Sequence, residues 1–111
     1  MRKIERAMCD AITSGHNWSS SNTQVVFTHG QLASAWVFLH GNHIATVTPG
    51  WVELFDGGWQ TVTTKSRLNA ILDTFSFGSG VFQKNWDWFV RDFKSGDVFP
   101  FVDGFSVRRN D

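Results

Sequence analysis

Two histidines at the tip of a predicted hairpin are the first residues whose spacing suggests chemistry. His40 ends one apolar, β-favouring run and His43 begins the next. Gly41-Asn42 between them suits a two-residue primed turn, because glycine tolerates positive φ. The two imidazoles would then face each other with Cβ atoms about 5 Å apart, close enough to share a metal ion. Two histidines without a third ligand do not define a metal site, so a pair of polar side chains at a hairpin tip is the alternative.

A run of hydroxyls and cations within residues 63–67 is the second candidate. Thr64, Lys65, Ser66 and Arg67 gather where a helix is predicted to begin. Backbone N–H groups point outward at a helix N-terminus and can hold a phosphate, which makes this cluster a candidate site for nucleic acid or another anion. The alternative is that Thr64 or Ser66 only caps the helix while both cations are solvated.

The aromatic residues are the third candidate, since the chain has six Trp, eleven Phe and no Tyr. Large, rigid apolar side chains are enriched at the centres of protein interfaces. Trp51, Trp59, Trp86 and Trp88 are therefore candidate interaction residues. Burial in the core is the simpler expectation for most of the Trp side chains, because the hydrophobic effect favours it.

No catalytic constellation accompanies these candidates in the sequence. Cys9 lacks the flanking residues of a catalytic thiol. The Gly78-Ser79-Gly80 run lacks the lysine and the spacing of a phosphate-binding loop. We therefore expect a protein without enzymatic activity and without a cofactor, and a hydrolase or metalloprotein of unfamiliar type is the alternative.

Length and composition narrow the class of protein. At 111 residues the chain is long enough for one domain, residues 1–111, with a core of its own. Ten basic and ten acidic side chains give no bulk attraction to nucleic acid or to an anionic membrane. The single cysteine fits a reducing compartment, and no apolar run approaches the roughly 20 residues that span a bilayer. These features predict a cytoplasmic protein that does not bind membranes.

The elements that must position the candidates are predicted by residues 36–75. Turns at Gly41-Asn42, Pro49-Gly50 and Gly57-Gly58 separate four β-favouring runs, of which the last ends at Thr63. Large apolar side chains fall on both faces of the resulting antiparallel sheet. We therefore expect both faces to be covered at least in part, by helices or by a second copy of the chain.

Two helices and several further strands are predicted from periodicity. Residues 2–13 carry a modest apolar stripe, and a clearer stripe at i, i+3, i+4 and i+7 begins at Leu68 and predicts a helix at about 65–76. Residues 81–91 fit a helix or a strand, and a strand with an irregularity near Asn85 is favoured by their aromatic content. Further short strands are predicted at 25–28, 98–102 and 105–107, with a loop at 29–31 after the first of them.

These patterns together predict an α+β fold. It is a single domain built on a curved antiparallel β-sheet of five to seven strands that are joined by consecutive hairpins. An N-terminal helix and the helix at about 65–76 complete it.

Three segments of the chain resemble a family of small bacteriophage-encoded proteins, including proteins of marine phages, that have no assigned activity. The pattern is an NT before a strand, an LxGNxIA hairpin, and GWxTxTTxxRLNxIL. It is matched by Asn22-Thr23, by Leu39–Ala45 and by Gly57–Leu72, and Gln83 before a run of aromatics agrees as well. The resemblance spans about residues 22–90. It implies a phage origin and a location in the host cytoplasm, and it implies no activity.

Three functions follow as hypotheses. The first is a non-enzymatic binding protein that acts on a host or phage protein, because charge is balanced and Trp is in surplus. The second is a nucleic-acid-binding regulator that uses Lys65 and Arg67, with Lys84 and Arg91 as further candidates, beside exposed Trp, since bases stack on aromatic side chains. The third is an unrecognised hydrolase or metalloprotein. We also expect a homodimer, because two apolar sheet faces need cover.

Overall fold

The computed structural model describes residues 1–30 and 33–110, and part of the predicted loop at 29–31 lies outside these residues. Within these residues, two helices and nine strands confirm the predicted α+β class. In chain order they are α1 (Lys3–Ser14), β1 (Trp18–Ser20), β2 (Thr23–Thr28), β3 (Ser34–Leu39), β4 (Asn42–Val47), β5 (Trp51–Leu54), α2 (Val62–Phe75), β6 (Ser79–Lys84), β7 (Asp87–Asp92), β8 (Val98–Pro100) and β9 (Phe105–Arg108).

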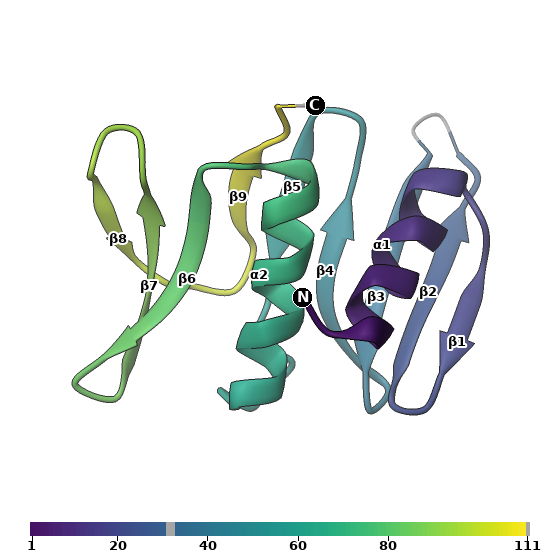
Figure 1. Cartoon of the computed structure of the whole chain (residues 1–111), viewed down its shortest axis with the longest axis horizontal. Coiled ribbons are helices and arrows are strands. Elements are labelled where there is room, and N and C mark those ends of the chain that lie inside the picture. The colour runs from purple at the N-terminus through teal and green to yellow at the C-terminus, as the bar shows by residue number, and fades with distance from the viewer. Residues whose placement is uncertain (31–32, 111) are drawn as a thin grey trace.

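The strands divide between two antiparallel sheets. Six form one sheet in the order β1-β2-β3-β4-β5-β9, and three form the other in the order β6-β7-β8. Figure 1 shows both helices on the same face of the six-stranded sheet, with the smaller sheet beyond its β9 edge. Neither described helix is long and apolar enough to cross a membrane.

The core lies between the six-stranded sheet and the two helices. Val25, Val37, Ala45 and Leu54 stand side by side across β2, β3, β4 and β5. All four are fully buried. Because side chains alternate along each strand, the next row, which contains Trp36 and Thr46, points to the opposite face. The helices therefore cover one face only, and cover of the other face by a second copy of the chain stays a prediction.

The β3–β4 turn lies one residue earlier than predicted. Its central residues are His40 and Gly41, with φ of 52° and 78°, as a type I′ turn requires. Phe38 then stands opposite His43, and the predicted pairing of His40 with His43 is wrong. A shift of one residue moves side chains to the other face of a sheet.

Helix α2 begins earlier than predicted, and the predicted strand at 59–63 is wrong. Thr61 is the N-cap: its hydroxyl accepts a hydrogen bond from the Thr64 N–H at 3.0 Å. The Thr64 hydroxyl bonds back to the Thr61 hydroxyl at 2.9 Å. Thr64 and Ser66 are therefore inside the helix and do not cap it.

Residues 79–92 form a hairpin, which confirms the strand favoured for 81–91. Asn85 and Trp86, with φ of 52° and 70°, form the turn between two strands, β6 and β7, where one strand with an irregularity near Asn85 was predicted. Pro100 lies in β8, an edge strand, as expected for a residue that cannot donate a backbone hydrogen bond.

A buried ion pair joins the two helices. Arg67 Nη1 on α2 lies 2.7 Å from Glu5 Oε2 on α1, and both side chains are nearly fully buried. Ser66 Oγ also donates to Glu5 Oε2, at 2.6 Å. Arg67 Nε donates to Thr23 Oγ1 on β2 at 3.1 Å, and Nη2 donates to Asn22 Oδ1 at 3.3 Å. The guanidinium thus ties both helices to the sheet.

Replacing Arg67 with methionine tests this network. We expect Arg67→Met to lower the free energy of unfolding by about 3–5 kcal/mol, because it leaves the Glu5 carboxylate buried without its partner. The double variant Glu5→Met/Arg67→Met should lose less free energy of unfolding than Arg67→Met, because no buried charge is left unpaired. The measurement is urea unfolding at neutral pH, and Lys65→Met on the same helix, which we expect to change the free energy by less than about 0.5 kcal/mol, is the control. A loss below 1 kcal/mol for Arg67→Met would contradict the assigned role.

Candidate functional site

An aromatic cluster occupies the face of the six-stranded sheet that the helices leave open. We define the aromatic face as Trp36, Phe38, His43, Trp51 and Phe55. The His43 ring lies at its centre, with its centroid 4.6 Å from that of Trp36, 5.7 Å from that of Phe38 and 4.4 Å from that of Phe55. The Trp36 and His43 rings are stacked, with an angle of 25° between their planes.

The register of the sheet places these side chains together. Trp36 stands beside Thr46, and Thr46 stands beside Glu53 on β5. Trp51 and Phe55 are each two residues from Glu53 and therefore point to the same face. The aromatic face thus gathers side chains from β3, β4, β5 and the residue that follows β5.

The aromatic face is exposed to solvent and carries little charge. Trp36 is 38% exposed and Trp51 is 51% exposed, whereas Phe38, His43 and Phe55 are half-buried against one another. Glu53 and Arg108 lie on the same side of the sheet, so one acid and one base flank it. An apolar surface of this kind is typical of an interaction site.

The environment of His43 favours the neutral imidazole. Burial lowers its pKa, and this effect outweighs a backbone hydrogen bond at Ala45 and the charge of Glu53, which both raise it. Nε2 lies 2.7 Å from Thr46 Oγ1. His43 therefore belongs to the packing of the aromatic face.

The two predicted metal candidates are not brought together as expected. His40 lies exposed in the β3–β4 turn, whereas His43 packs against Trp36 and Phe55. Within residues 1–30 and 33–110, no group of three or more His, Cys, Asp or Glu side chains is arranged to hold a metal ion.

The predicted anion-binding cluster is divided between interior and surface. Arg67 and Thr64 are buried, and the Ser66 hydroxyl donates to Glu5. Lys65 is half-buried and makes no side-chain hydrogen bond or ion pair within the described part of the chain. The prediction of a solvated pair of cations is therefore wrong for Arg67.

The predicted interaction tryptophans differ in exposure. Trp51, Trp59 and Trp86 are exposed, by 51%, 73% and 88%, whereas Trp88 is 3% exposed and packs edge-on against Phe101. The expectation that most Trp side chains lie in the core is thus wrong, and so is the interaction role for Trp88. Trp36 was not predicted as an interaction residue. The correct register, in which Trp36 pairs with Thr46 and so shares the face of Trp51, would have identified it.

Comparison with known families gives one match. The sequence profile described as Kyanoviridae Gp96 protein matches residues 1–108. No curated protein and no solved structure matches the chain. The match confirms the predicted relation to a family of phage proteins.

The pKa of His43 predicts a pH-dependent stability. A histidine whose pKa is lower in the folded protein binds its proton more readily when unfolded, so stability falls as pH drops below the ordinary value of 6.5. We expect the free energy of unfolding of the unaltered protein to decrease more between pH 8 and pH 5 than that of His43→Gln. Urea unfolding at both pH values measures this difference, and equal decreases would contradict the burial of a neutral imidazole.

Proposed function

The chain belongs to the Kyanoviridae Gp96 protein family, and we propose that it is a non-enzymatic binding protein whose aromatic face docks on a host or phage protein. One observation carries the proposal: Trp36 and Trp51 are exposed on a sheet whose opposite face is fully packed. In this proposal the protein acts in the cytoplasm of the infected host.

The packing of the aromatic face suits it to binding. His43 is held by Trp36, Phe55 and Thr46, so the rings are ordered before a partner arrives. Side chains that are ordered in advance lose less conformational entropy on binding. Exposed Trp residues are also the side chains that most often dominate binding energy at interfaces.

The charge of the aromatic face favours a protein partner over nucleic acid. Glu53 and Arg108 balance each other on this side of the sheet, and Arg67 is committed to Glu5 in the interior. Nucleic acid binds mainly through phosphate contacts from Lys and Arg, which make its affinity depend strongly on salt. Binding through the aromatic face should depend only weakly on salt, because its area is apolar.

Substitution of the exposed tryptophans tests the proposal. A tagged pull-down from host lysate, with and without nuclease, identifies a partner, and binding to the purified partner is then measured at 50 mM and 300 mM salt. We expect Trp36→Ala and Trp51→Ala each to weaken binding about tenfold or more, since a buried Trp at an interface contributes about 2 kcal/mol or more. Trp86→Ala is the matched control, because Trp86 is 88% exposed but lies on the β6–β7 turn.

Three outcomes would contradict protein docking on a foreign partner. Capture that disappears with nuclease would indicate nucleic acid. Light scattering that gives the mass of two chains for the unaltered protein and of one chain for Trp36→Ala would assign the aromatic face to a homodimer. Equal affinity of Trp36→Ala, Trp51→Ala and Trp86→Ala would place the partner elsewhere on the surface.

A further inference from the structure

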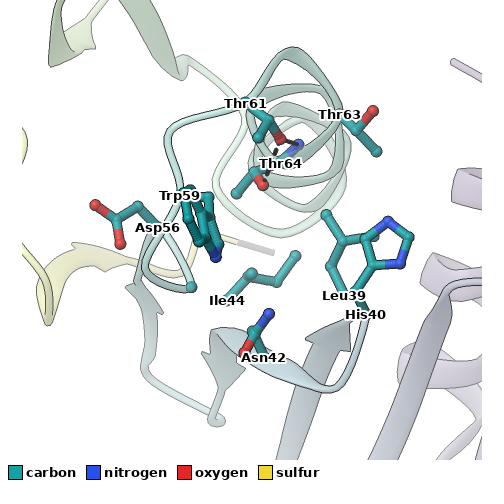
Figure 2. Close-up of a pocket in the computed structure, with 10 residues that line it drawn as sticks. Leu39, His40, Asn42, Ile44, Asp56, Trp59, Thr61, Thr63 and Thr64 are labelled. Atoms are coloured by element: carbon teal, nitrogen blue, oxygen red, sulfur yellow. Dashed lines mark hydrogen bonds between the residues drawn. The ribbon is translucent and has the colours of Figure 1, made fainter.

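A hollow of about 400 Å³ opens between the β3–β4 turn, the loop before α2 and the first turn of α2. None of the aromatic-face residues lines it. Its volume lies within the range of small-molecule sites, about 300–1,000 Å³. Figure 2 shows the indole of Trp59 on one side, Leu39 and His40 on the other, Ile44 between them and Asn42 below.

The hollow has an apolar floor and an aromatic wall. Leu39 and Ile44 are 4% and 1% exposed and form the floor, whereas Trp59 is 73% exposed. The loop that carries Trp59 lies close to β4. A Cβ added to Gly57 would lie only 3.1 Å from Ile44 Cγ2.

Backbone hydrogen bonds hold this loop. The Trp59 N–H donates to the Asp56 carbonyl at 3.3 Å, and the Trp59 carbonyl accepts from the Thr61 N–H at 3.1 Å. The indole is therefore exposed on an ordered turn, and it is available to stack on a ring that rests on the floor.

The free polar groups at the hollow are an amide, an imidazole and a hydroxyl. The side chains of Asn42, His40 and Thr63 make no hydrogen bond with the described residues. The Asp56 carboxylate is already engaged, by the Gly58 N–H at 2.8 Å and by Gln60 Nε2 at 3.5 Å. No Lys or Arg is among the residues that line the hollow. The lining therefore suits a neutral ring that carries hydrogen-bonding groups on its edge.

We propose that this hollow binds one unpaired nucleobase, carried by a free nucleoside or by a single strand. Nucleobases stack on Trp irrespective of their sequence. A carboxamide presents one donor and one acceptor, which can pair with the edge of a base. Because no cation lines the hollow, the base is the part that is recognised, and the phosphate is not. Trp59 is the stacking residue and Asn42 the residue that selects the base.

Titration followed by NMR tests the proposal. The probes are adenosine, guanosine, cytidine and uridine, single-stranded DNA and RNA hexamers, and methyl glucoside, each added to the ¹⁵N-labelled full chain. We expect the Trp59 indole N–H and the Asn42 amide signals to shift with nucleosides and hexamers. Trp59→Ala should weaken binding about tenfold or more. Asn42→Ala should weaken binding about fivefold and change the order of preference among bases.

The controls separate this site from the aromatic face. Trp86→Ala removes an indole that is even more exposed than that of Trp59 and lies elsewhere, and Trp36→Ala alters the aromatic face, so both variants should bind nucleosides as the unaltered protein does. Hexamers that bind more tightly than nucleosides would identify a single strand as the source of the base, and equal affinities would identify the free nucleoside.

Three results would overturn the proposal. The first is the absence of NMR shifts with nucleosides at 10 mM and with hexamers at 1 mM. The second is binding that Trp59→Ala leaves unchanged while its circular dichroism shows a folded protein. The third is a shift with methyl glucoside and none with nucleosides, which would assign the hollow to a sugar.

Discussion

The ion pair between Glu5 and Arg67 is the constraint on which the arrangement of this fold depends. It connects α1 to α2 in the interior, and through Thr23 and Asn22 it connects both helices to β2. A buried charge that loses its partner is strongly destabilising, so the two helices cannot separate without a large cost. Because the pair holds both helices on one face of the six-stranded sheet, the other face is left open for the aromatic side chains.

The same constraint involves residues of the segments from which the resemblance to phage proteins was predicted. Asn22 and Thr23, the predicted NT pair, accept hydrogen bonds from Arg67, the arginine of the predicted RLN segment. The asparagine of that segment, Asn69, donates to the Val81 carbonyl at 2.9 Å and accepts from the Val81 N–H at 2.7 Å, which ties α2 to β6. These residues of the predicted pattern therefore hold the two sheets to α2.

The fold class followed from local patterns, but the faces of the sheet did not. Apolar periodicity and turn residues were enough for the two helices and most strands. The β3–β4 turn was misplaced because His40, a residue with a Cβ, adopts positive φ, which favours glycine or asparagine. That shift, together with the irregularity between Val37 and Phe38, put Trp36 and His43 on the face opposite Trp51 and Phe55 in the prediction. Arg67 was misassigned because its partner, Glu5, lies 62 residues away in sequence.

The exposed tryptophans are the clearest argument that the surface of this protein is functional. The buried hydrophobic core consists mainly of aliphatic side chains, and Trp88 is its one buried Trp among the described residues. No buried side-chain nitrogen or oxygen in the described residues lacks a hydrogen bond. Trp36, Trp51 and Trp59 lie outside this core. Trp36 and Trp51 belong to the aromatic face and Trp59 to a hollow, so the first pair suits a protein surface and the last suits a single ring.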